Sequence, residues 1–140
     1  MDAVGTLGDQ WSVSETTLSS LQKLTCSLYG MPKVSDVNEC RYNKLTALCC
    51  TDNLNIVKPT KQFDTAFIPH AYVSFVEHVK RVNYQVGIWK RSHENFPCIP
   101  KPTDNQGWIV HAGMNSILLP NWFDGDMLPQ TIINGLPYSE

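Results

Sequence analysis

The sequence predicts a small α+β fold, mainly helical, with three main helices, a long central one among them, a C-terminal β-hairpin and a short terminal helix. Apolar residues recur at helical spacing in three segments, whereas "GWIV" and "SILL" are short β-prone runs separated by turn-forming residues. The 140-residue length suits one domain, and 42% hydrophobic with 17% charged residues is typical of a folded globular chain. We expect a flexible leader over 1–11 and a single domain over 12–140.

The first helix is expected within "SVSETTLSSLQKLTCSLYGMP". Ser12 and Glu15 have the spacing of a capping box, in which each side chain satisfies a free backbone N–H of the other residue. Gly30 stands where a left-handed C-terminal cap is needed, and Pro32 prevents the helix from continuing.

A second helix is expected in "SDVNECRYNKLTALCC", with Ser35 as its N-cap. The apolar side chains that can face a core are Val37, Cys40, Leu45 and Leu48. The next stretch, "TDNLNIVKPTKQFDTAFIP", has no stable period, so we expect an extended connection there.

The longest helix is predicted over residues 70–94, between Pro69 near its start and Pro97 beyond its end. Glu77 and Arg81 are placed for an i,i+4 ion pair. A continuous apolar stripe has spacings of four and three residues: Phe75, Val79, Val82, Val86 and Trp89. If Trp89 lies in the core, Trp89→Ala should lower the free energy of unfolding by about 3–5 kcal/mol.

The chain after Pro97 changes to a proline-rich linker followed by the hairpin, whose turn contains Gly113 and Asn115. In "DGDMLPQTIING" we expect a turn and then the short final helix, with Pro129 in its first turn. The two carboxylates of "DGD" fit a turn and helix cap better than a metal site.

The overall charge and apolar content limit the classes of partner. A net charge of −2 and a pI near 6.0 give no general attraction to nucleic acid. No apolar run approaches the roughly 20 residues that span a bilayer, and the N-terminus lacks the apolar core of a signal peptide. We therefore expect an intracellular protein, cytoplasmic or nuclear, with no membrane partner.

The five cysteines and four histidines show no catalytic or metal-binding pattern. There is no C-x-x-C or H-x-x-x-H pair, and vicinal cysteines make a zinc set of Cys40, Cys49, Cys50 and His70 awkward. A catalytic Cys–His pair that meets only in space stays an alternative. We expect no enzyme activity, no cofactor, and no catalytic or metal-ligating residues.

Basic residues of the long helix raise the question of nucleic-acid binding. They spread over about half of the helix circumference, with glutamates nearby, so a solvated face with ion pairs is the first interpretation. The alternatives are a protein-docking site and a weak phosphate-contact strip formed by Lys80, Lys90 and Arg91.

Four phrases occur together: "LTCSLYG", "VNECRYNKL", "HVKRVNYQVGIWK" and "GWIV…LLPNW". In this order and spacing they resemble a C-terminal region of uncharacterised invertebrate proteins of apparent mobile-element origin. The resemblance covers roughly residues 18–134, with Val82 where that family usually has alanine. It implies no established activity. It indicates a fragment or domesticated remnant without the cysteine-rich segment that often follows the region in relatives.

The polar residues in these phrases are interpreted as a lock between the second and the long helix. Buried amides without partners cost about 1–3 kcal/mol, so we expect mutual hydrogen bonds. The residues of this lock are Glu39, Arg41, Tyr42, Asn83, Tyr84 and Gln85. The expected function is a non-enzymatic structural or protein-interaction module with an unidentified protein partner, and the alternative is an accessory nucleic-acid-binding module.

Overall fold

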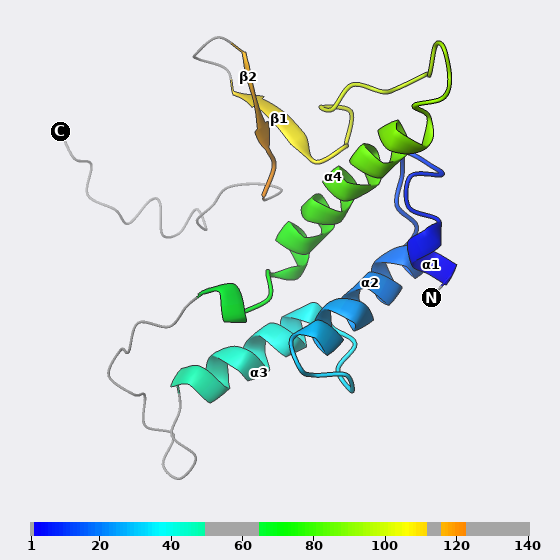
Figure 1. The fold of residues 1–140 in the computed structure, drawn as a ribbon. Coiled ribbons are helices and arrows are strands. Elements are labelled where there is room, and N and C mark those ends of the chain that lie inside the picture. The colour runs from blue at the N-terminus through cyan, green and yellow to red at the C-terminus, as the bar shows by residue number, and fades with distance from the viewer. Residues whose placement is uncertain (1, 50–64, 112–115, 123–140) are drawn as a thin grey trace, which may run out of the picture.

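The part of the chain that the structure describes folds into helices with one small antiparallel hairpin, which confirms the mainly α fold class (Figure 1). The structure is a computed structural model that describes residues 2–49, 65–111 and 116–122. Its elements are α1 (Asp2–Gly5), α2 (Glu15–Leu28), α3 (Val37–Cys49), a 3₁₀ turn (Thr65–Phe67), α4 (Tyr72–Lys90), β1 (Trp108–His111) and β2 (Ile117–Pro120). The expected extended connection after the second helix, the hairpin turn and the final helix fall largely or wholly outside the described residues.

The N-cap of helix α2 lies two residues later than predicted. Ser14, not Ser12, is the N-cap, and its hydroxyl accepts a hydrogen bond from the backbone N–H of Thr17 at 3.2 Å. At the other end, Gly30 has a φ of +81° and donates to Ser27 O, while Met31 donates to Cys26 O. These two bonds form a Schellman motif, so the predicted glycine cap is confirmed.

Helix α3 is capped by Asp36 rather than by Ser35. Asp36 Oδ1 accepts hydrogen bonds from the backbone of Asn38 at 2.7 Å and, more weakly, of Glu39 at 3.4 Å. The carboxylate is the better cap because it places a negative charge at the positive end of the helix. Val37 and Cys40 are fully buried, as predicted for this face.

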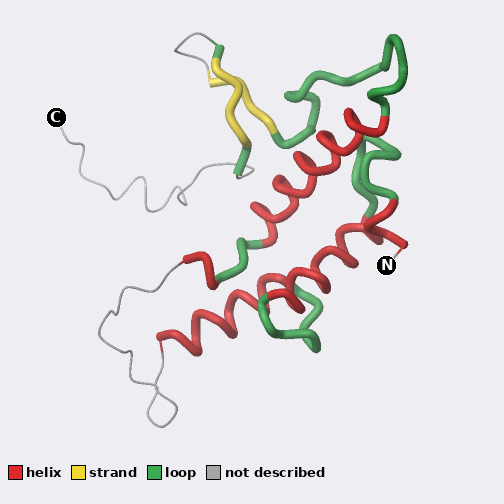
Figure 2. Tube along the Cα trace, in the orientation of Figure 1, coloured by secondary structure: helices red, strands yellow, loops and turns green. Residues whose placement is uncertain are grey.

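The apolar core lies where α2, α3 and the first half of α4 meet (Figure 2). Its buried members are Leu18, Val37, Phe75 and Val79. Partly buried side chains from the same helices and from the segment before α2 surround them. The core is therefore small, and the second half of α4 contributes none of its members.

Helix α4 is shorter than predicted and its apolar stripe is only partly buried. It ends at Lys90, where the Arg91 side chain folds back to donate to Gly87 O at 3.0 Å. Phe75 is 7% exposed, but Trp89 is 64% exposed, so the prediction that Trp89 lies in the core is wrong. The helical period was right, but α2 and α3 cover only the first half of the helix.

The predicted hairpin is present as an antiparallel pair. Its register places Trp108 opposite Pro120, Ile109 opposite Leu119 and Val110 opposite Leu118. Among the described helices, none combines the length and apolar character needed to cross a membrane.

Candidate interaction surface

The N-terminal segment, residues 2–11, is docked on the second half of α4 instead of forming a flexible leader. Gly8 is buried, and its N–H donates to Asn83 Oδ1 at 2.8 Å. The Asn83 side chain in turn donates to Gln10 O at 2.8 Å, so one buried amide holds both ends of a short loop. Leu7 is only 8% exposed. The leader expectation is corrected because this buried amide and apolar burial fix the segment.

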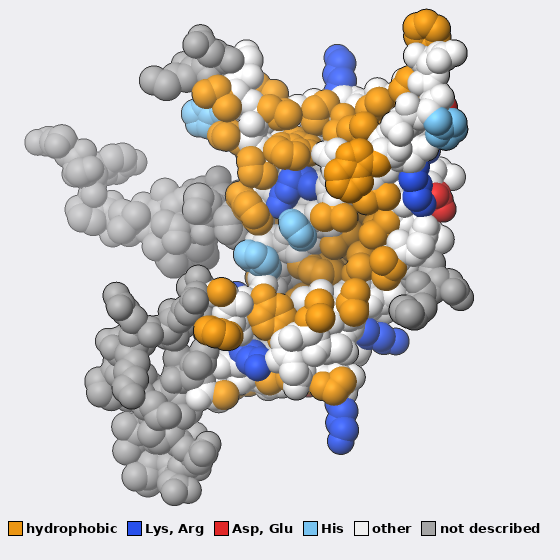
Figure 3. All heavy atoms as spheres, in the orientation of Figure 1, with side chains coloured by type: hydrophobic (Ala, Val, Ile, Leu, Met, Phe, Trp, Pro, Cys, Tyr) orange, Lys and Arg blue, Asp and Glu red, His pale blue; other side chains and the backbone are white. Residues whose placement is uncertain are grey.

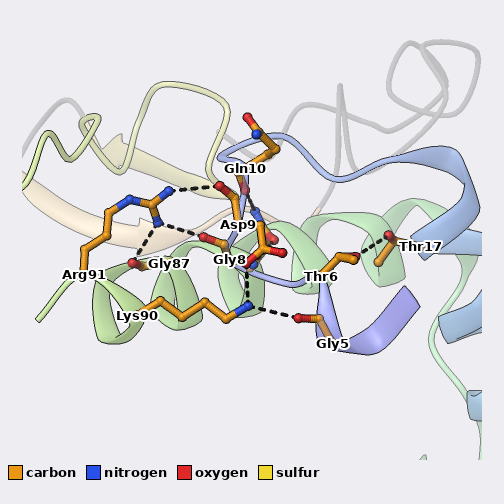
Figure 4. A network of polar contacts seen from close by, with 10 residues as sticks. Gly5, Thr6, Gly8, Asp9, Gln10, Thr17, Gly87, Lys90 and Arg91 are labelled. Atoms are coloured by element: carbon orange, nitrogen blue, oxygen red, sulfur yellow. Dashed lines mark hydrogen bonds and ion pairs between the residues drawn. The ribbon is translucent and has the colours of Figure 1, made fainter. Parts of the chain in front are cut away.

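Two cations at the end of α4 bind the same segment (Figure 4). Lys90 donates to Asp9 Oδ1 at 2.6 Å and to Gly5 O at 3.0 Å. Arg91 donates to Gly8 O at 2.8 Å and to Asp9 O at 3.0 Å. Both predicted phosphate contacts are thus bonded to oxygens of their own chain, which lowers their availability to a phosphate.

An aromatic layer completes this junction. The Arg91 guanidinium lies over the Trp11 ring, 4.4 Å from its centre, and Trp11 also contacts Tyr84. A Cβ added at Gly87 would come within 2.6 Å of the Trp11 ring, so α4 needs a glycine where the tryptophan crosses it. The contact explains why Tyr84 is half-buried on a helix face that α2 and α3 leave open.

The predicted polar lock between α3 and α4 does not form as expected, because its members find other partners. Arg41 donates to Pro69 O at 2.8 Å, and Tyr84 donates to Pro100 O at 3.0 Å. Tyr42, Glu39 and Gln85 are exposed. A side-chain hydrogen bond between the two helices comes instead from Asn38, whose Oδ1 accepts from Tyr72 N at 2.8 Å. Asn38 thereby satisfies a free N–H in the first turn of α4, a role that sequence spacing cannot show.

A second polar junction fixes the base of the hairpin to α4. Arg81 is 8% exposed and donates to the carbonyl oxygens of Gly107 at 3.1 Å and of Asn121, the residues that flank the two strands. Ser74 donates to Trp122 O at 2.9 Å. Burial lowers the pKa of Arg81, and the charge of Glu77 opposes that shift. Residues on one face of α4 therefore hold the start of β1 and the end of β2.

Glu77 and Lys80 complete this junction. Glu77 is 3% exposed and accepts from Lys80 at 2.6 Å and from the Asn121 side chain at 3.1 Å. Lys80 also donates to Asn105 Oδ1 at 2.9 Å. The expected Glu77–Arg81 ion pair is thus replaced by a Glu77–Lys80 pair, because Arg81 is drawn to the hairpin carbonyls. The third predicted phosphate contact, Lys80, is also bonded within the chain.

The hairpin leaves nearly half of the surface of its aliphatic residues in water. The exposed fractions are 44% for Ile109, 49% for Val110, 49% for Ile117, 41% for Leu118 and 38% for Leu119. Alternate residues of a strand point to opposite faces, so both faces of the hairpin are apolar and half-exposed. Uninterrupted apolar runs are typical of strands that are covered on both faces. Figure 3 shows hydrophobic side chains spread over the hairpin and across α4.

A hollow of about 540 Å³, lined mainly by polar residues, lies where the N-terminal segment meets the start of α2. Thr17 and Asn83 line it, and both are already hydrogen-bonded to neighbouring residues of the chain. No three His, Cys, Asp or Glu side chains in the described ranges lie close enough together to hold a metal ion. Among the described residues, the exposed apolar surface of the hairpin is therefore the best candidate for an interaction site.

Comparison with known proteins adds no relative from which a role could be taken. No protein-family model, no curated protein and no solved structure matches this chain.

Proposed function

We propose that the protein is a non-enzymatic protein-interaction module whose docking surface is the β1–β2 hairpin. The observation that carries this proposal is the half-exposure of five aliphatic residues on the two faces of a two-stranded sheet. Full burial of one aliphatic side chain contributes about 1.5–3 kcal/mol, so covering the exposed parts of five would contribute roughly 3–7 kcal/mol. A protein that covers these faces would gain that free energy.

The attachment of the hairpin supports a docking role. An isolated two-stranded hairpin is marginally stable in water. Here Arg81 and Ser74 hold its base through the carbonyls of Gly107, Asn121 and Trp122. The strands are therefore presented in a fixed position before any partner arrives, which reduces the entropy cost of binding.

Nucleic-acid binding, the alternative, has less physical support. Lys80, Lys90 and Arg91 donate to oxygens of their own chain, so phosphate binding would have to break contacts that stabilise the fold. The mobile-element origin rests on the motif series alone, and we propose it on that basis.

A photoreactive amino acid placed on the hairpin tests the proposal. We would substitute it for Leu118 and, as a matched control, for the exposed Lys23 on α2. Irradiation of cells that make the two variants should give protein adducts from position 118 and few or none from position 23. Equal yields from the two positions, or no adduct from position 118, would contradict the proposal.

A further inference from the structure

The open edge of β1 points to a specific partner. We infer that the hairpin pairs with a second copy of this chain, β1 against β1, to form a four-stranded antiparallel sheet. The inference rests on the proposed function and deepens it by naming the partner and the edge.

The register determines which backbone groups of β1 are free. Asn121 N donates to Gly107 O at 2.8 Å, just outside the Trp108–Pro120 pair. In an antiparallel ladder, bonded and non-bonded pairs alternate. Trp108 and Val110 therefore direct their N–H and C=O groups away from β2, while Ile109 uses its own within the hairpin. No partner within the described residues takes the outward groups of Val110.

The outer edge of β2 offers fewer hydrogen-bond donors to another strand than the outer edge of β1. By the same alternation its outward-facing residues are Leu118 and Pro120. Proline has no N–H, so this edge offers one outward donor where β1 offers two. Proline at an edge is one of the devices that discourage strand addition. The difference favours β1 as the edge that accepts another strand.

The charge pattern favours a second copy over a charged partner. The residues Trp108–His111 and Ile117–Pro120 include no Lys, Arg, Asp or Glu, the side chains that usually protect an edge. A two-fold interface must be complementary to itself, and an uncharged antiparallel strand edge meets that condition. Pairing Trp108 with Val110 of the second copy places the two-fold axis at Ile109. Each Ile109 then lies beside its counterpart.

The available area indicates a weak dimer. Pairing along β1 covers surface of that strand only, where a half-exposed aliphatic residue leaves roughly 80 Å² in water, so Ile109 and Val110 offer roughly 160 Å² per copy beside the backbone hydrogen bonds across the axis. This area lies well below the ~1,000 Å² lower bound of a stable specific interface, so the pairing is weak. Association should therefore be measured over roughly 10–500 µM.

Two proline variants test the edge by sedimentation velocity. Val110→Pro and Leu118→Pro each remove one outward N–H, and neither removes a bond inside the hairpin. Val110→Pro removes two intermolecular bonds per dimer, so it should raise the dissociation constant of the dimer about tenfold or more, and Leu118→Pro should leave it within about twofold of wild type. Equal effects of the two variants would overturn the assignment to β1.

If a proline variant unfolds, oppositely charged substitutions at Ile109, on the two-fold axis, provide a second test. Ile109→Lys and Ile109→Glu should each be monomeric, because like charges would face each other across the axis. An equimolar mixture should form a heterodimer. A mixture that stays monomeric, or a wild-type protein that is monomeric at 500 µM, would overturn the self-pairing. Adducts to other proteins from position 118 would then still support the proposed function.

Discussion

Gly8 of the N-terminal segment lies directly against Gly87 of α4. A Cβ added at Gly8 would come within 2.6 Å of Gly87 N, and Gly8 has a φ of +80°. Backbone therefore contacts backbone, and the conformation at Gly8 is one that only glycine adopts without strain. This contact lets Gly8 N–H reach the buried Asn83 side chain.

Gly8→Ala should release the N-terminal segment from α4. The added methyl group meets backbone atoms that cannot move aside, and the positive φ adds strain, so we expect a loss of about 2–4 kcal/mol in the free energy of unfolding. Urea unfolding measures the loss. Gly5→Ala is the control, because a Cβ there would meet nothing within 4 Å. Equal midpoints for the two variants would show that the segment is not docked.

Asn83→Ala should destabilise the protein, and Gln85→Ala should not. Asn83 is 2% exposed, and truncation leaves Gly8 N–H and Gln10 O without their partner, at a cost of about 1–3 kcal/mol. Gln85 is exposed, so its truncation should cost less than about 0.5 kcal/mol. Thermal unfolding of both variants gives the comparison. A larger effect from Gln85 would point to the lock between α3 and α4 that the sequence suggested.

Phe75→Ala and Trp89→Ala separate the two halves of α4. Phe75 is 7% exposed in the core, so its truncation should cost about 3–5 kcal/mol. Trp89 is 64% exposed, so the same change there should cost less than about 1 kcal/mol. Similar urea midpoints for the two variants would mean that the whole stripe is buried.

Sequence reasoning succeeded where the determining contacts are local. The glycine cap after α2 and the two strands follow from residues that are neighbours in the chain. It failed for the N-terminal segment because those contacts join residues far apart, 75 positions between Gly8 and Asn83 and 85 between Gly5 and Lys90. Gly8 and Gly87 look like isolated glycines in the sequence. The sequence likewise predicts a solvated face for the cations of the long helix, because their oxygen partners lie in distant segments.

The Cys26 thiol should make stability depend on alkaline pH. Burial, and then the neighbouring Cys40, raise its pKa from the ordinary 9.0 to about 11. Because the folded-state pKa is the higher one, its contribution is fully present below pH 9 and is lost as the pH rises towards 11. A pKa difference of two units corresponds to a loss of about 3 kcal/mol at most in the free energy of unfolding.

Urea unfolding from pH 8 to 11, with a reductant present, measures this effect. Cys26→Ala is the matched variant, and its free energy of unfolding should fall less steeply than that of the wild type over this range. Other groups titrate there too, so the difference between the two slopes is the quantity to compare. Parallel profiles would contradict the buried, protonated thiol.

The central claim is that the apolar faces of the hairpin serve a partner and not the fold itself. The most direct test is the double variant Ile109→Lys with Leu119→Glu, a cross-strand pair on one face whose residues are 44% and 38% exposed. Opposite charges at paired positions leave the hairpin intact, so the free energy of unfolding should stay within about 1 kcal/mol of wild type. Adduct formation from a photoreactive residue at position 117, which points to the same face as Ile109 and Leu119, should be lost. A fall of more than about 3 kcal/mol in stability, or adduct formation that persists, would contradict the account.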